Sequence, residues 1–417
     1  MPFVPNGAVL PDYEHGCFAH IPDLVHHLLT GKGAPVLSAE QLGYEDRRYD
    51  RVIVILIDAF GWCFFEKIAH RYPFLRRITR EGQVARLTSQ FPSTTTAHVT
   101  TLFTNQVVGQ HGLFEWQFYE PGLDDMIIPL QFSFSGDSQP ETLRATGIDP
   151  AGLYPPSTFF QTLAADGIRT YVFQHNDYRA STYSTLMTRG ARTSGFKTWA
   201  EVLVNVRMRA EKAPAGTALF VYLDTLDATL HRYGPEAPQA WAEMDAIFTT
   251  LERVFWRQAA GRLENTFLLL TADHGQMQVY PEKTIYLNQL PEFERLLPLL
   301  RRNRRGKILA PGGSPRDMFL YVLDGAVEEA VAILRAALDG RADVYPEQEL
   351  EAAGLFGPQP VSPAFTARRG NVVILPHDRE AVWWYEKDRF EQKHRGHHGG
   401  LSAQEMQIPL LLYDLSS

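Results

Sequence analysis

Six side chains that can bind metal ions fall into four groups in this chain of 417 residues, three of them at or just beyond the ends of apolar segments. In order along the sequence they are Asp58, Asp227, His231, Asp273, His274 and His398. Carboxylate and imidazole ligands together suit zinc, whereas carboxylates alone favour magnesium or calcium. Two sets of three such ligands, with one hydroxyl, would serve a two-metal phosphoryl-transfer reaction.

Each group of ligands also has a simpler structural explanation when it is taken alone. An Asp that follows a strand, such as Asp58, often serves as a turn or helix-cap residue. Asp227 and His231 have a spacing that puts them on one face of a helix, which also suits a surface pair. Asp273 and His274 are neighbours in sequence. Because successive strand residues point to opposite faces, both can bind at one metal site only where the chain leaves a strand. The metal site is therefore predicted from the complete set.

The densest group of histidines lies in the segment 393–402, Lys-His-Arg-Gly-His-His-Gly-Gly-Leu-Ser. One interpretation is a flexible surface loop. The other is a ligand segment, because its glycines allow close approach of the backbone. Spacing alone does not decide which of His394, His397 and His398 binds a metal ion.

A hydroxyl-rich segment, residues 91–98, opens a predicted helix. Ser and Thr are common helix N-caps, which is one explanation of Thr94 and Thr95. A hydroxyl at a helix N-terminus also lies in a positive field, and beside a metal ion it can act as a nucleophile. The nearby His98 and His111 are predicted to be structural residues rather than ligands.

Short apolar runs alternate with helical patterns along most of the chain, which indicates a mostly parallel sheet with helices on both faces. Strands are predicted over 51–57, 83–89, 168–174, 217–223, 265–271 and 408–412. Helices are predicted over 95–106, 157–166, 196–211 and 236–258. The predicted fold class is α/β, an αβα sandwich. Active sites of such sheets collect at the carboxyl ends of the strands, so distant ligands can converge there.

The sequence pattern changes between residues 281 and 390. This part is predicted to be an inserted α+β subdomain, while 1–280 and 391–417 form the metal-binding core. Strands of the insertion are expected over 318–323, 343–345 and 371–376, and a helix over 326–338. The basic segment 301–307 and the glycine- and proline-rich segment 311–315 are expected to be exposed loops.

Composition excludes several classes of protein. Apolar residues make up 45% of the chain and charged residues 21%, which is ordinary for a globular protein with a full core. A net charge of -8 gives no sign of a surface for a nucleic-acid polymer. No segment approaches the roughly 18 apolar residues of a membrane span, and the N-terminal segment does not resemble a secretory signal. We therefore expect a cytoplasmic location, and the oligomeric state, a homo-oligomer included, stays open.

Taken in order, these groups resemble the alkaline phosphatase superfamily, and most closely its nucleotide pyrophosphatase/phosphodiesterase branch. The resemblance covers nearly the whole chain. Its motifs are Asp58 after the first strand, Phe91-Pro-Ser-Thr-Thr95, Thr104-Asn105 with His111-Gly112, Asp227 with His231, Asp273-His-Gly275, Arg369-Gly-Asn-Val-Val-Ile-Leu-Pro376 and His398-Gly-Gly400. Each motif is modest, but the ordered set is specific.

The resemblance implies two zinc ions as cofactors. One would be held by Asp227, His231 and His398, and the other by Asp58, Asp273, His274 and Thr95. Thr95 would be the nucleophile, because family nucleophiles lie three residues after the proline, and Thr94 is the alternative. The implied reaction is a two-step in-line displacement on a small-molecule phosphate ester, through a covalent phospho-threonine.

Three departures from the family pattern bear on the substrate. Residues 111–116 lack the Asn that holds a phosphoryl oxygen in the phosphodiesterase branch, so the substrate-binding residues stay unassigned. Tyr222 stands where monoesterases carry a Glu for a third metal ion, which favours a two-zinc site and diester chemistry. Neither Cys17 nor Cys63 lies in the context that sulfatases need.

We therefore predict a zinc-dependent phosphodiesterase or nucleotide pyrophosphatase. A phosphomonoesterase or phosphonate hydrolase on the same scaffold, and a metal-binding homologue without turnover, are the competing predictions. Aromatic residues close to the ligands in sequence form either a stacking pocket for an organic group or part of the core: Phe60, Trp62, Phe114, Trp116 and Tyr119.

Overall fold

A central sheet sets the positions of all the ligand groups. The computed structural model describes residues 7–416, so the outermost ends of the predicted core, 1–6 and 417, lie outside the described residues. In this part of the chain the largest sheet has seven strands in the order β2-β18-β9-β1-β8-β6-β7. Their bounds are β1 (Arg51–Ile57), β2 (Gln83–Thr88), β6 (Arg169–His175), β7 (Ala191–Phe196), β8 (Thr217–Leu223), β9 (Thr266–Thr271) and β18 (Gln407–Asp414).

The sheet is mostly parallel, as predicted. Strands β9, β1, β8, β6 and β7 run parallel, and β18 lies antiparallel between β9 and β2. The apolar runs of β1, β8 and β9 are buried because both faces of the sheet are covered. All six predicted strands are confirmed. Strand β7 was not predicted, because an edge strand is paired on one side only and its sequence, Ala-Arg-Thr-Ser-Gly-Phe, has no apolar run.

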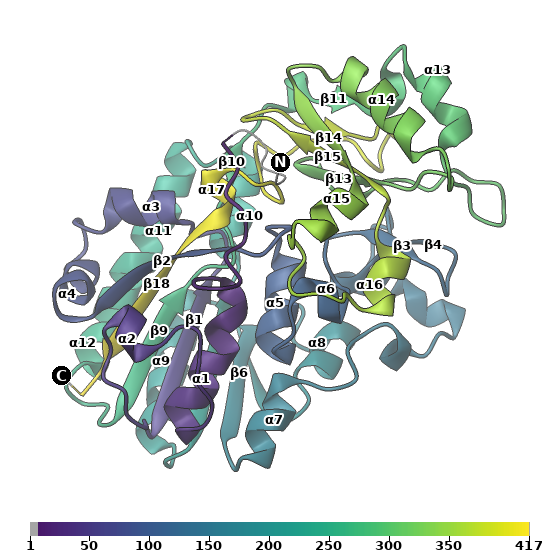
Figure 1. Ribbon diagram of the computed structural model, residues 1–417. Coiled ribbons are helices and arrows are strands. Elements are labelled where there is room, and N and C mark those ends of the chain that lie inside the picture. Colours follow the sequence, from purple (N-terminus) through teal and green to yellow (C-terminus); the bar gives the residue numbers. More distant parts are fainter. Residues whose placement is uncertain (1–6, 417) are drawn as a thin grey trace.

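Helices cover both faces of this sheet (Figure 1). One face carries α1 (Ile21–Thr30), α5 (Thr95–Thr104) and α7 (Phe159–Ala165). The other carries α4 (Pro73–Glu81), α9 (Trp199–Lys212) and α11 (Pro238–Thr250). The helix predicted over 236–258 is confirmed with one change in its hydrogen bonding. After α11, Leu251–Trp256 form a π-helical turn that leads into α12 (Arg257–Ala259).

A second, smaller α+β unit packs beside the main sheet, at the upper right of Figure 1. Its sheet has the order β12-β13-β15-β14. Its elements are β12 (Gly312–Ser314), β13 (Asp317–Leu320), α14 (Val327–Ala337), β14 (Ala342–Pro346) and β15 (Val372–Pro376). It has a hydrophobic cluster of its own, which also includes Tyr119 and Met126 from outside the segment 281–390. The strands and the helix predicted here are present, and the exact division of the chain into subdomains stays a prediction.

The segment 311–315 is not the exposed loop that its composition suggested. All five residues are buried, and Gly312 to Ser314 form β12. The N–H of Gly313 donates to the carbonyl oxygen of Gln117 at 2.9 Å. A Cβ added to Gly313 would lie 2.0 Å from Asp317 O, so glycine is required for the close approach of β12 to β13. The glycines therefore serve tight packing rather than exposure.

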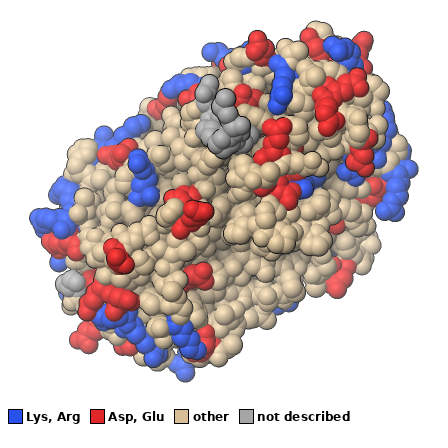
Figure 2. All heavy atoms as spheres, viewed as in Figure 1, with Lys and Arg blue, Asp and Glu red and all other residues tan. Residues whose placement is uncertain are grey.

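The surface carries charges of both signs. On the face shown in Figure 2, Lys and Arg are interspersed with Asp and Glu, mainly around the edges. Within residues 7–416, no helix combines the length and the apolar composition that crossing a membrane requires.

Candidate active site

The carboxyl ends of three adjacent strands bring the first ligand group together. The register pairs Ile57 of β1 with Leu223 of β8, and Leu56 of β1 with Thr271 of β9. Residues that follow these strands therefore lie at the same edge of the sheet, as the topology predicts. Asp58 extends the pairing, because its N–H donates to Leu223 O at 2.9 Å.

Asp58, Asp273 and His274 form one compact, buried group. One ligand atom from each lies within 4.8 Å of the others. Nε2 of His274 is 3.5 Å from Oδ1 of Asp58 and 3.6 Å from Oδ2 of Asp273. Nδ1 of His274 is 3.0 Å from Gly275 O and must donate to it, so Nε2 presents a lone pair to both carboxyl groups. Oδ2 of Asp273 is buried without a hydrogen-bond partner, which suits a cation between these atoms.

Asp227, His231 and His398 form a second group beside the first. Asp227 and His231 lie on α10 (Thr225–Tyr233), where the i,i+4 spacing puts both on one face. Nε2 of His231 is 3.4 Å from Oδ2 of Asp227 and 3.2 Å from Nε2 of His398. The ring of His398 stacks on that of His274 with centroids 3.8 Å apart, so the two groups are in direct contact.

The hydroxyl of Thr95 lies in the first group. Its Oγ1 is 3.3 Å from Oδ2 of Asp58 and 3.2 Å from Nε2 of His274. The neighbouring Thr94 is turned away, because its hydroxyl donates to Phe114 O at 3.1 Å. Thr95 is the first residue of α5, and no side chain of the described residues caps this helix. Its first-turn N–H groups therefore remain free to donate to an anion.

Burial opposes the charged forms of these ligands in the absence of cations. It raises the pKa of Asp227 and of Asp273 to about 7. It raises the pKa of Asp58 well above its usual value, and the nearby Asp273 and Asp227 add to that shift. Burial also lowers the pKa of all three imidazoles, that of His231 to about 4. Neutral imidazoles and carboxyl groups that need a counter-charge are what a divalent cation would stabilise.

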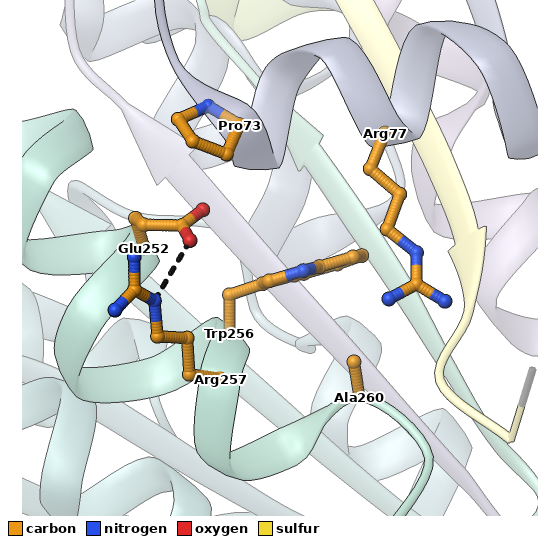
Figure 3. Close-up of a pocket in the computed structure, with 6 residues that line it drawn as sticks. All are labelled: Pro73, Arg77, Glu252, Trp256, Arg257 and Ala260. Atoms are coloured by element: carbon orange, nitrogen blue, oxygen red, sulfur yellow. Dashed lines mark hydrogen bonds and ion pairs between the residues drawn. The ribbon is translucent and has the colours of Figure 1, made fainter.

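A cavity of about 930 Å³ reaches the second group and Thr95. It is lined by Thr95, Asp227, His231 and His398, and Trp116, Trp383 and Phe390 contribute aromatic surface. Figure 3 shows a second cavity, of about 310 Å³, in which Trp256 lies between Arg77 and the ion pair of Glu252 with Arg257. This second cavity is lined by none of the predicted ligands, so the larger cavity is the candidate active site.

The structure separates the remaining predicted residues by role. Of the five aromatic residues considered for a stacking pocket, Trp116 lines the cavity, with 44% of its surface exposed. Phe60 and Phe114 belong to the hydrophobic core. His98 and His111 are buried and hydrogen-bonded, as expected of structural residues.

Sequence reasoning missed several residues that hold the ligands in place. Gln276 donates through Nε2 to Oδ1 of Asp227. Tyr222, noted only as a departure from a family pattern, donates its hydroxyl to Oδ2 of Asp58. Ser93 accepts from Nδ1 of His398 through its carbonyl oxygen at 2.9 Å. The position of Gln276, just after Asp273-His-Gly275, was a signal available in the sequence; the backbone contact of Ser93 had none.

Comparison with known proteins gives a match to one family. The sequence model described as type I phosphodiesterase / nucleotide pyrophosphatase matches residues 52–401, a range that contains all six predicted ligands. No curated protein sequence matches the chain.

Solved structures with the same fold are recognisable at low sequence identity. Human ectonucleotide pyrophosphatase / phosphodiesterase 5 is 15% identical, with a TM-score of 0.62 over 87% of this chain and 87% of that chain. The murine protein of the same name is 17% identical, with a TM-score of 0.61 over 86% of this chain and 87% of that chain. Phosphonoacetate hydrolase from Sinorhizobium meliloti 1021, in complex with phosphonoacetate, is 18% identical, with a TM-score of 0.61 over 89% of this chain and 92% of that chain.

Proposed function

Because this chain belongs to the type I phosphodiesterase / nucleotide pyrophosphatase family, we propose that it is a zinc-dependent phosphodiesterase or nucleotide pyrophosphatase that acts through a phospho-threonine at Thr95. One observation carries the assignment of the nucleophile. Oγ1 of Thr95 lies within 3.3 Å of both Oδ2 of Asp58 and Nε2 of His274, and Thr95 lines the same cavity as Asp227, His231 and His398. Thr94, the alternative, directs its hydroxyl to Phe114 O.

The ligand atoms support two zinc ions. We assign one ion to Asp227, His231 and His398, and the other to Asp58, Asp273, His274 and Thr95. Mixed carboxylate and imidazole sets are typical of zinc. The lone pairs of His231 Nε2 and His398 Nε2 face each other. Oδ2 of Asp273 is buried without a hydrogen-bond partner among the described residues. Both observations favour cations at these positions. When bound, the two ions would neutralise the carboxylates and withdraw negative charge from the phosphoryl group.

The chain's own groups explain how Thr95 would act. The first turn of α5 places its free N–H groups and the positive end of the helix beside the hydroxyl, which favours both an alkoxide and a bound phosphate. Asp58 and His274 hold the hydroxyl oxygen towards the cavity. Oγ1 would attack phosphorus as the bond to the leaving oxygen breaks. Water would then cleave the phospho-threonine and regenerate Thr95.

The size of the cavity favours an ester with a substantial organic group. About 930 Å³ is near the upper end of the roughly 300–1,000 Å³ typical of sites for small organic ligands, far more than phosphonoacetate requires. Trp116 and Phe390 supply apolar walls for such a group. We therefore favour a phosphodiester or nucleotide over a small phosphonate as the substrate.

The experiment compares substrates and variants on one zinc-loaded preparation. Rates are measured with bis(4-nitrophenyl) phosphate, 4-nitrophenyl phosphate and phosphonoacetate, and the diester is expected to be the fastest. Thr95→Ala should lower the diester rate by at least about 1,000-fold, as expected when a nucleophile is removed. Thr94→Ala is the matched control and should retain most of the activity. Acid quenching followed by mass spectrometry should find phosphate on Thr95, and diester hydrolysis that survives Thr95→Ala would refute the proposal.

A further inference from the structure

Two histidines outside the proposed ligand set lie against His231. They are His394 and His397, and the centroids of their rings are 4.6 Å and 5.1 Å from that of His231. One ring nitrogen from each of the three residues lies within 4.8 Å of the others. His394 is exposed and His397 is buried, so the group extends from the surface to the proposed ligand His398.

The backbone holds this histidine segment close to α10. A Cβ added to Gly396 would lie 2.5 Å from Leu230 O, so only glycine permits this approach. The approach lets Arg395 N donate to His231 O at 2.8 Å and lets Gly396 O accept from Nδ1 of His231 at 2.8 Å. The three imidazoles are therefore brought together by main-chain contacts, independently of any metal ion.

The nitrogens of this group are available as ligands. Nδ1 of His397 is buried and has no hydrogen-bond partner among the described residues. Lys393, one of the two basic residues next to His394 in the sequence, pairs with Glu391 at 3.0 Å, which reduces its repulsion of a metal ion. A set of three imidazoles suits zinc rather than magnesium or calcium.

His231 can serve only one ion at a time. Its Nδ1 donates to Gly396 O, so Nε2 is its single lone pair. That same atom faces Asp227 and His398 in the proposed zinc position. An ion on His394 and His397 that completes its ligand set with His231 must therefore use the nitrogen that the inner position also needs.

We infer that His394 and His397 form an entry site that captures a zinc ion from solution. The ion then passes to the position of Asp227, His231 and His398 while Nε2 of His231 stays bound to it. The transfer is a ligand exchange in which two imidazoles leave the ion as a carboxylate and another imidazole replace them. It involves no change of oxidation state. This inference rests on the zinc assignment of the proposed function.

Zinc uptake by the metal-free full-length protein tests the transfer. The protein is stripped with a chelator and mixed with zinc held by a fluorescent indicator, whose signal reports uptake. His394→Ala/His397→Ala should reach the same final zinc content as the unchanged protein, but more slowly by about tenfold, the smaller end of the effect of accessory ligands on metal binding. His15→Ala/His70→Ala, which removes two exposed histidines that do not line the cavity, is the matched control. Equal uptake rates, or a third ion retained at equilibrium, would overturn the inference.

A second measurement isolates the entry site from the inner position. In Asp227→Ala, Co²⁺ should still bind to His231, His394 and His397 and give the visible spectrum of an ion with imidazole ligands. Adding His394→Ala/His397→Ala to that variant should remove the contribution of this ion to the spectrum and one bound Co²⁺, while leaving the ion held by Asp58, Asp273 and His274. Persistence of that contribution would reject the entry site. A protein that binds no zinc or Co²⁺ in its unchanged form would instead contradict the proposed function itself.

Discussion

Nε2 of His231 lies 3.2 Å from Nε2 of His398, and both nitrogens carry lone pairs. Each ring donates through Nδ1 to a backbone carbonyl, that of Gly396 for His231 and that of Ser93 for His398. Two lone pairs at this distance repel each other unless a proton or a cation lies between them. Because burial lowers the pKa of both rings, a metal ion is favoured over a proton. The backbone thus orients both ligands before any ion is bound.

Replacing His398 and His397 one at a time is expected to show that His398, and not its neighbour, is a zinc ligand. His398→Ala removes a nitrogen that faces both His231 and Asp227, so the affinity for one of the two zinc ions should fall. Diester hydrolysis should fall by more than about 100-fold, beyond the range for residues that only hold a metal ligand in place. His397→Ala is the matched control and should keep two ions at equilibrium. Zinc content after dialysis against buffered zinc measures the difference. If His397→Ala lost the ion and His398→Ala kept it, the assignment of the two histidines would have to be exchanged.

Tyr222 is expected to tune the metal position that contains Asp58. Its hydroxyl donates to Oδ2 of Asp58 and so fixes the direction of that carboxylate. Tyr222→Phe keeps the ring and removes only the donor, and it should weaken zinc binding at that position by roughly 10- to 100-fold. Competition with a zinc chelator measures the change, with Tyr233→Phe, at an exposed tyrosine, as the control. An unchanged zinc affinity would show that Asp58 is oriented without this hydrogen bond.

The core of the fold was predictable because its signals are local. Strands buried on both faces appear as uninterrupted apolar runs, so β1, β8 and β9 were found from sequence alone. The edge strand β7 and the short β12 lack such runs. The segment 311–315 has the composition of a loop, and its burial depends on its pairing with the strand that follows and on a contact with Gln117, which is remote in sequence.

The candidate site was predictable as an ordered set of residues, but not in its supporting contacts. The order of the motifs along the chain suggested which residues meet. What selects Thr95 over Thr94 is the hydrogen bond of Thr94 to Phe114 O, and what orients His398 is the carbonyl oxygen of Ser93. Both contacts use backbone atoms, which carry no sequence signal. The role of Tyr222 likewise follows from the pairing of β8 with β1 and not from any motif.

The stability of the protein is expected to depend on pH differently with and without zinc. Burial raises the pKa of Asp227 and Asp273 to about 7 in the folded, metal-free protein, above their unfolded values near 4. Between about pH 4 and about pH 7 these two carboxyl groups bind more protons in the folded state than in the unfolded state. Their contribution to the free energy of unfolding therefore decreases as the pH rises through that range. Zinc requires the deprotonated carboxylates, so its stabilising effect should increase over the same range.

Thermal unfolding at pH 6.5 and pH 8 measures this dependence. The gain in Tm on adding zinc should be larger at pH 8 than at pH 6.5, because more of the carboxyl groups are then deprotonated. Glu115, whose pKa burial raises to about 8, shifts stability in the same direction in both forms and cancels in the comparison. Buried histidines such as His98, whose pKa burial lowers to about 4, act in the opposite direction, because the unfolded chain still binds protons at its histidines near pH 6.5. Asp227→Asn/Asp273→Asn should remove the contribution of the two carboxyl groups, so the Tm of the metal-free variant should rise more, or fall less, from pH 6.5 to pH 8 than that of the unchanged protein, and an equal change in the two proteins would contradict the explanation.

A buried ion pair is expected to connect the smaller α+β unit to the segment that carries His398. Arg316, beside β12, contacts Glu405 through two hydrogen bonds of 3.0 Å and 2.9 Å, and both side chains are at most 1% exposed. Glu405 also accepts from Gly400 N at 3.1 Å, close to His398. Glu405→Gln should lower the free energy of unfolding by about 3–5 kcal/mol, because it leaves the guanidinium buried without a counter-charge.

Urea unfolding with a matched pair of variants tests the contribution of this ion pair. Glu236→Gln makes the same change in the exposed pair of Glu236 with Arg379, and it should lower the free energy of unfolding by at most about 1 kcal/mol. The double variant Arg316→Met/Glu405→Leu removes both charges and should be more stable than Glu405→Gln, because no charge is left unpaired in the interior. If Glu405→Gln unfolded at the same urea concentration as Glu236→Gln, the Arg316–Glu405 pair would contribute no more than a surface contact.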